Sequence, residues 1–109
     1  MEKLLHYIWK HRILPLSELR TTDGRSVEVI DPGLQNMHAG PDFFNAKVRI
    51  DGVMWVGNVE IHERSADWFL HGHDTDAAYN NVVLHVAAVV DADVVTEHGD
   101  HLPQVQLAV

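Results

Sequence analysis

Hydrophobic and polar positions alternate most regularly between residues 43 and 62. Apolar side chains fall on every second position in residues 43–50, and the same period continues through residues 53–62. Successive side chains of a strand project to opposite faces, so this period predicts two strands. Asp51-Gly52 between them is a hairpin turn signal. We therefore predict an antiparallel hairpin with one apolar face.

Other segments follow different patterns. Residues 2–12 place apolar side chains at helical spacings, which predicts a short amphipathic helix that Pro15 ends. Ser65 is a suitable N-cap for a second short helix over residues 65–70. Residues 82–90 are apolar except at His85, which is typical of a central strand covered on both faces. Shorter extended runs are predicted at residues 16–20, 27–30, 94–96 and 104–109, and a loop at 34–41.

This order of elements predicts an α+β fold, a mixed α/β sandwich. Its central sheet is mostly antiparallel and is flanked by short helices. A β-sandwich is the alternative. The 109 residues suit a single domain, residues 1–109. The chain stops inside an apolar run, so we expect an N-terminal fragment of a longer protein that packs against its missing C-terminal domain.

Composition narrows the function classes. The chain has 8 Lys and Arg against 16 Asp and Glu, and Lys and Arg are absent from Ser65 onward. A duplex-binding surface normally needs clustered basic residues, so any nucleic-acid contact would come from the first half or through a bound cation. The lack of cysteine excludes disulfides and thiolate metal sites. With no long apolar run and no secretory signal, we expect a cytoplasmic protein without a membrane partner.

Two acids and a base stand where the hairpin can bring them together. Glu60 and His62 end the second strand on one face, and Asp42 precedes the first strand. A hard cation such as Mg²⁺ or Mn²⁺ takes carboxylate oxygens as ligands. We predict Asp42, Glu60 and His62 as catalytic residues, with His62 positioning or deprotonating an attacking water. Alternatively, Asp42 caps a loop and Glu60 pairs with a basic residue across the hairpin.

A second group consists of histidines with acids between them. Imidazole and carboxylate suit Zn²⁺, so a histidine site is the alternative cofactor prediction. His73 is also predicted to support the metal held by Asp42 and Glu60, as an outer or direct ligand. Solvated loop histidines and a buried His85 with a backbone partner would explain the same residues without a metal. The residues concerned are His62, His71, His73 and His85.

The run Gly40-Pro41-Asp42-Phe43, followed by a hairpin and Glu60-Ile61-His62, resembles the PD-(D/E)XK nuclease signature. In that superfamily a Pro-Asp pair starts one strand and Glu-x-Lys ends the next. The resemblance implies a restriction-endonuclease-like core and metal-dependent phosphodiester hydrolysis, with nucleic acid as partner. His62 stands where the family has lysine, so the resemblance also allows a degenerate, inactive site.

A finer resemblance covers nearly all of the chain. The runs Ala39-Gly40-Pro41-Asp42, Trp55-Val56-Gly57-Asn58 and His71-Gly72-His73-Asp74 resemble the N-terminal part of an uncharacterised bacterial protein family, known as a domain of unknown function. The leading hypothesis is thus a nuclease-like metal-dependent phosphodiesterase. The alternatives are a non-catalytic scaffolding or binding module and a histidine-based zinc hydrolase or small-molecule binder.

Overall fold

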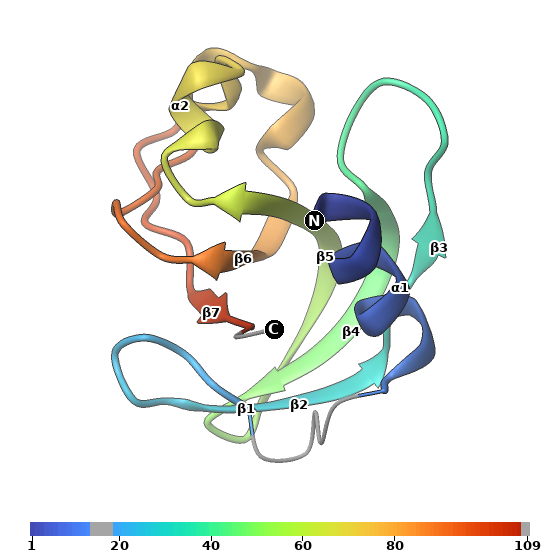
Figure 1. The fold of residues 1–109 in the computed structure, drawn as a ribbon. Helices are drawn as coiled ribbons and strands as arrows, with labels where there is room; N and C mark the ends of the chain where they lie inside the picture. The colour runs from blue at the N-terminus through green and yellow to red at the C-terminus, as the bar shows by residue number, and fades with distance from the viewer. Residues whose placement is uncertain (14–18, 108–109) are drawn as a thin grey trace.

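The structure is a computed structural model that describes residues 1–13 and 19–107. A helix comes first, a run of strands follows it, and a short helix with 3₁₀ turns separates these strands from the last ones (Figure 1). The elements are α1 (Glu2–His11), β1 (Leu19–Arg20), β2 (Ser26–Asp31), β3 (Leu34–Gln35), β4 (Phe43–Ile50), β5 (Val53–Arg64), α2 (Asp67–Leu70), η2 (His73–Thr75), η3 (Ala77–Tyr79), β6 (Val82–Val89) and β7 (Gln104–Gln106).

The described strands form one mixed sheet in the order β1-β2-β4-β5-β6-β7, with β3 added on β4. Pairing is antiparallel from β1 to β5 and parallel from β5 to β7. The sheet curls until its two ends approach: the Thr22 amide, just after β1, donates to the carbonyl oxygen of Gln104 in β7 over 2.9 Å. The fold is therefore mixed α/β, with a seven-stranded sheet that forms a nearly closed barrel (Figure 1).

The predicted hairpin is confirmed by β4 and β5. Ile50 pairs with Val53, and the turn residues Asp51 and Gly52 have φ of 47° and 81°. Two positive φ values in a two-residue loop match the strand twist, which explains why Asp-Gly occurs there. Because the pairing continues to Phe43 opposite Val59, the start of β4 lies beside the end of β5.

The first helix agrees with its prediction. Leu5, Ile8 and Trp9 are buried, and Arg12 ends the helix in the left-handed conformation with φ of 52°. The Trp9 indole N–H donates to the Pro32 carbonyl over 3.0 Å, which fixes α1 against the barrel. Pro15 lies outside the described residues. Among the described helices, none has the length and apolar character required to cross a membrane.

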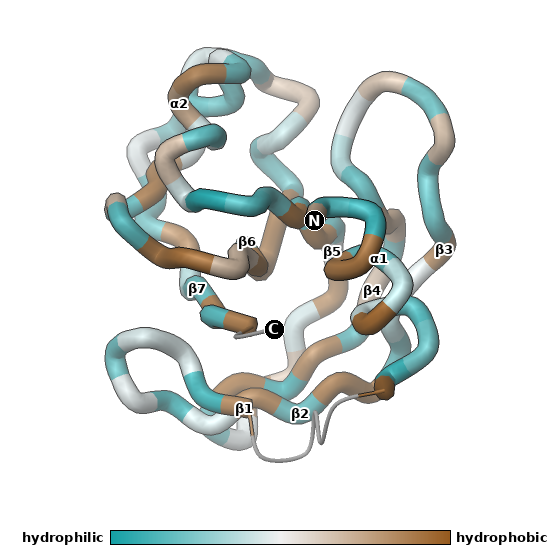
Figure 2. Tube along the Cα trace, viewed as in Figure 1, coloured by the Kyte–Doolittle hydropathy of each residue, from teal (hydrophilic) through white to brown (hydrophobic). Residues whose placement is uncertain are grey.

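Two hydrophobic cores lie on the two faces of the sheet. The larger fills the barrel interior with α1, and its chain segments are the brown stretches of β2, β4 and β5 in Figure 2. The smaller lies under α2, η2 and η3 and contains Trp68, Tyr79, Val82 and Val94. Since β5 alternates, Val59 and Ile61 enter the first core while Glu60 and His62 face the second.

Several predictions need correction. The mixed α/β class is confirmed, but the single sheet curls into a nearly closed barrel instead of forming a sandwich, and the topology does not show the restriction-endonuclease-like core. Residues 34–41 include a short strand at Leu34–Gln35, and the predicted strand 94–96 is only an isolated bridge between Val95 and His101. Ser65 does not cap α2; its hydroxyl accepts from the amides of Asp91 and Ala92.

Gly57 marks the closest approach of β5 to the start of β6. A Cβ there would lie 2.5 Å from Val83 Cγ1 and 2.6 Å from the Asn81 carbonyl oxygen. Because that oxygen is backbone, Gly57→Ala should force the strands apart and lower the free energy of unfolding by about 1–3 kcal/mol. Urea denaturation tests this, with the exposed neighbour Val56→Ala as control. Equal effects of the two substitutions would contradict the steric explanation.

Candidate metal centre

Three elements place four polar side chains on the outer face of the barrel. Glu60 and His62 come from β5, His73 from η2 and His85 from β6. All four are buried, His62 at 1% exposure. Strand pairing sets Glu60 opposite His85, and the crossover from β5 to β6 folds back over both strands. Four titratable groups thus share a site largely closed to solvent.

The histidine cluster, defined as His62, His71 and His73, has the geometry of a metal site. One ligand atom from each lies within 4.8 Å of the other two. Glu60 joins it, because its Oε2 is 3.2 Å from His62 Nε2 and 2.9 Å from His73 Nε2. His71 is exposed whereas His62 and His73 are buried, so the cluster opens to solvent on the His71 side.

A second carboxylate stands beside the first. Glu60 Oε1 accepts from the Asp42 amide over 3.1 Å, and Asp42 Oδ2 accepts from the Ile61 amide over 2.8 Å. These reciprocal bonds hold the start of β4 against the end of β5. His6 of α1 approaches the same Asp42 Oδ2, at 3.4 Å from its Nε2. Asp42 therefore links α1 to the centre.

A chain of hydrogen bonds fixes the tautomer of His62. Gln104 Nε2 donates to the Ala92 carbonyl over 2.8 Å, so its Oε1 accepts from His85 Nδ1, also over 2.8 Å. With the proton on Nδ1, neutral His85 accepts at Nε2 from His62 Nδ1, 2.7 Å away. This assignment follows from the network. It leaves a lone pair on His62 Nε2, the atom that faces Glu60.

Burial sets the protonation of these groups. Burial, followed by the neighbouring histidines, lowers the pKa of His62 to about 3, and burial lowers that of His85 to about 4. Burial also lowers the pKa of His73. The imidazoles are therefore neutral at physiological pH, the state in which they bind metals.

The two carboxyl groups behave differently. Burial, followed by the charge of Asp42, raises the pKa of Glu60 to about 10. Burial also opposes ionisation of Asp42, but hydrogen bonds from His6, Glu60 and Ile61 outweigh it and hold its pKa below the ordinary value. One acid thus stays charged while the other retains a proton in the absence of a cation.

Two buried nitrogen atoms of the cluster, His62 Nε2 and His73 Nδ1, have no hydrogen-bond partner among the residues that the structure describes. Buried polar atoms are normally satisfied, so unpaired ones indicate a missing ligand. A divalent cation would use a lone pair of His62 and replace the proton on Glu60. The donor set therefore fits a bound metal.

The structure brings together all the residues predicted for the site. Glu60 contacts Asp42, His62 and His73 at the distances given above, while the catalytic and metal-binding roles of these residues remain predictions. Sequence reasoning missed His6 and Gln104. His6 could have been noticed as a polar residue one turn from Trp9 on α1. Gln104 had no local signal, since it reaches the site only through the parallel pairing of β7 with β6.

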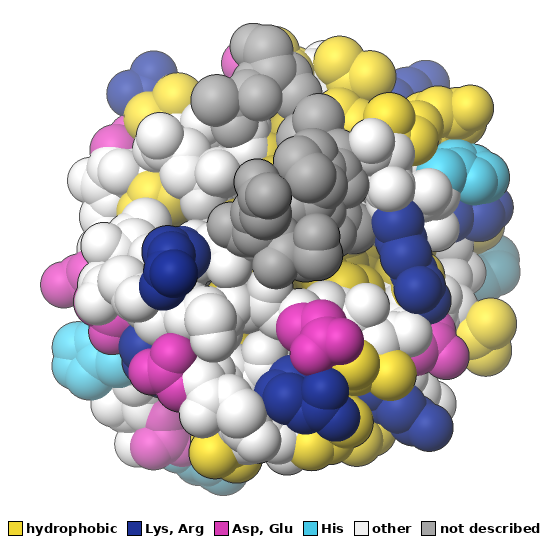
Figure 3. Space-filling model, turned by 90° about the horizontal axis from the view of Figure 1, so that it is seen from below, with side chains coloured by type: hydrophobic (Ala, Val, Ile, Leu, Met, Phe, Trp, Pro, Cys, Tyr) yellow, Lys and Arg dark blue, Asp and Glu magenta, His cyan; other side chains and the backbone are white. Residues whose placement is uncertain are grey.

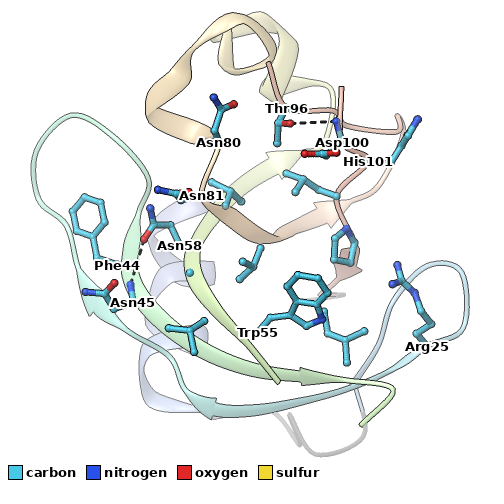
Figure 4. Close-up of a pocket in the computed structure, with 17 residues that line it drawn as sticks. Arg25, Phe44, Asn45, Trp55, Asn58, Asn80, Asn81, Thr96, Asp100 and His101 are labelled. Atoms are coloured by element: carbon cyan, nitrogen blue, oxygen red, sulfur yellow. Dashed lines mark hydrogen bonds between the residues drawn. The ribbon is translucent and has the colours of Figure 1, made fainter. Parts of the chain in front are cut away.

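A large cavity lies elsewhere. It has a volume of about 840 Å³ and opens between the hairpin β4–β5, the start of β6 and residues 96–103. Figure 4 shows Trp55, Asn58 and Asn81 bordering it, and the histidine cluster takes no part in its lining. This cavity is thus separate from the candidate metal centre.

These observations define a mixed α/β barrel domain with a three-histidine cluster that can hold a metal ion such as Zn²⁺. The chain belongs to the family described as Protein of unknown function (DUF2851), whose model matches residues 2–109. The resemblance to a domain of unknown function is therefore confirmed, whereas the family match shows no nuclease motif. No curated protein and no solved structure matches the chain.

Proposed function

We propose that this domain binds Zn²⁺ and acts as a metal-dependent hydrolase. His62, His71 and His73 would be the nitrogen ligands and Glu60 the carboxylate ligand. The observation that supports this most is the buried lone pair of His62 Nε2, which has no hydrogen-bond partner in the described part of the chain and lies 3.2 Å from Glu60 Oε2. Imidazole with carboxylate is a donor set typical of zinc in proteins.

The surrounding residues suit hydrolysis. Bound zinc would supply a Lewis acid that lowers the pKa of a coordinated water to about 7. His85 and Gln104 hold the His62 ring and its tautomer, as outer partners of metal ligands commonly do. Asp42 stays ionised and is partly exposed, so it can accept a proton from an attacking water. His6 beside it can orient that carboxylate.

A magnesium- or manganese-dependent phosphodiesterase acting on nucleic acid is the second candidate. The close approach of Asp42 and Glu60 favours it, because paired carboxylates are common ligands of these ions. Three imidazoles in the same place favour zinc, since Mg²⁺ prefers oxygen ligands. Metal preference therefore separates the two candidates.

The test is a metal titration of the purified protein after chelator treatment. We expect one Zn²⁺ per chain, bound more tightly than Mg²⁺, with affinity reduced by about 100-fold or more in His62→Ala and in His73→Ala. His98→Ala is the matched control, because His98 is exposed and outside the cluster. Wild-type protein without bound zinc, or unchanged affinity in His73→Ala, would refute the zinc centre.

Activity is measured on the zinc-loaded protein with carboxylic and phosphoric esters. Asp42→Asn is expected to lower kcat while zinc still binds, because it removes a proton acceptor and leaves the histidines in place. Circular dichroism of each variant checks that the fold is retained. Activity with Mg²⁺ alone that needs both Asp42 and Glu60 would favour the second candidate.

A further inference from the structure

We propose that the groove between α1 and the segment following β3 binds the anionic part of the substrate, a phosphate-bearing ligand with an aromatic ring and the size of a mononucleotide. This inference rests on the proposed hydrolase and names its substrate class. The groove has a volume of about 490 Å³, within the usual range for small-molecule sites. It is lined by Lys3, His6, Tyr7, Lys10, His11, Gln35, Asn36, Met37 and His38.

The charge of this lining is unlike that of the protein as a whole. Two lysines and three histidines line the groove, and no acid does, although the chain has 16 acids against 8 Lys and Arg. A concave surface with one sign of charge attracts ligands of the opposite sign. On the face seen in Figure 3, by contrast, Lys and Arg side chains are scattered among acidic and apolar ones.

The helix α1 supplies the cationic side of the groove. Its lining residues recur at spacings of three and four, so they form one stripe along the helix. The opposite stripe, with Leu5, Ile8 and Trp9, is buried in the barrel core. Burial of the apolar stripe therefore turns the lysines toward the groove.

The facing side is held in shape by Asn36. Its Nδ2 donates to the carbonyl oxygens of Ala39 and Pro41, each over 3.0 Å, and its Oδ1 accepts from the His38 amide over 3.0 Å. The Asn36 amide also donates to the Asp42 carbonyl over 2.8 Å. A side built in this way loses little conformational entropy on binding.

The groove leads to the candidate metal centre through His6. His6 belongs to the lining and also lies 3.4 Å from Asp42 Oδ2, whose carboxylate adjoins Glu60. A phosphate held beside α1 would therefore lie next to the hydrolytic residues. Tyr7 and Met37 are 56% and 78% exposed and offer apolar surface on which an aromatic ring can stack.

The experiment is calorimetric titration of the metal-free and the zinc-loaded protein with three probes at one ionic strength: adenosine monophosphate, adenosine and inorganic phosphate. We expect the nucleotide to bind more tightly than either part alone. In the double variant Lys3→Ala/Lys10→Ala its affinity should fall by about tenfold or more, because charge-assisted hydrogen bonds are lost. Lys47→Ala is the control, since Lys47 is exposed on β4 and outside the groove.

The outcomes are distinct. Unchanged nucleotide affinity in the double variant, or an equal loss of affinity in Lys47→Ala, would refute the proposal that the groove binds the nucleotide. Adenosine or phosphate binding as tightly as the nucleotide would refute it as well. Zinc stoichiometry is measured on the same samples and should be identical in the double variant. Nucleotide binding without zinc binding would refute the zinc-dependent hydrolase and support the groove as a binding site. Zinc binding without nucleotide binding would refute the groove and leave the zinc centre supported.

Discussion

Trp68→Ala is expected to lower the free energy of unfolding by about 3–5 kcal/mol, the usual cost of removing a large aromatic side chain from a core. Trp68 is 0% exposed, and its indole N–H donates to the Val95 carbonyl over 2.8 Å. Its ring packs edge-on against His73, Tyr79 and His85 at centroid distances of 5.2, 5.8 and 5.3 Å. The substitution thus opens a cavity directly beneath the candidate metal centre.

Urea denaturation of the metal-free protein measures the loss, because its midpoint and slope give the free energy of unfolding. Phe69→Ala is the matched control, since the neighbouring Phe69 is 40% exposed and outside both cores. We expect a change of about 0.5 kcal/mol or less for the control. If the two substitutions cost the same, the smaller core does not support the crossover.

The metal-free protein is expected to be most stable near pH 6.5 and to lose stability on either side. Below this pH, His62 and His85 bind protons in the unfolded chain but stay neutral in the folded protein, because their pKa values there are about 3 and about 4 against an ordinary 6.5. Their contribution is therefore present above pH 6.5 and is lost toward acid.

Glu60 has the opposite effect on stability, which it lowers as the pH rises. Its pKa of about 10 lies above the ordinary 4.5, so the folded state keeps a proton that the unfolded chain releases. The contribution is present below pH 4.5 and is lost as pH rises toward 10. Up to pH 6.5, the stability gained from His62 and His85 as the pH rises exceeds the stability lost from Glu60. Above pH 6.5, ionisation of Glu60 lowers the free energy of unfolding by about 1.4 kcal/mol per pH unit. His6 adds to the first part of this fall, because its hydrogen bond to Asp42 raises its pKa.

Thermal or urea unfolding between pH 5 and 9 tests this curve. Glu60→Gln should reduce the fall at alkaline pH, and saturating zinc should do so in the wild type by replacing the proton on Glu60. Glu28→Gln is the control, because Glu28 is exposed and pairs with Arg49 far from the centre. A fall at alkaline pH that persists unchanged in Glu60→Gln would rule out Glu60 as the buried acid.

The changes in stability with pH are large because the site consists of buried polar groups. A neutral Glu60 that lies beside both the neutral His62 and the ionised Asp42 is a costly arrangement without a ligand. Metal binding would convert this cost into affinity, because the ligands are already held in place. The same reasoning predicts that zinc raises the stability of the protein.

The sequence alone determined the elements that depend on local periodicity. The period of two in residues 43–62 with Asp51-Gly52 predicts β4 and β5, and the helical spacing of Leu5, Ile8 and Trp9 predicts α1. The hairpin turn also predicts that Asp42 lies near Glu60, although a β-bulge between Phe43 and Ala46, which the turn does not predict, shifts the register there by one residue. Local patterns suffice there because each element buries an apolar face whose period is visible in the sequence.

The tertiary structure decided everything that depends on contacts distant in the chain. Curling of the sheet into a barrel needs the parallel addition of β6 and β7, which no local pattern specifies. The approach of His6 to Asp42 depends on the packing of α1 against β5, and that of Gln104 to His85 depends on the pairing of β7 with β6. Consequently, the sequence predicted which acids and histidines stand at the site, and only the fold assigned the protons among them, because burial and hydrogen-bond partners set the tautomers and the pKa values.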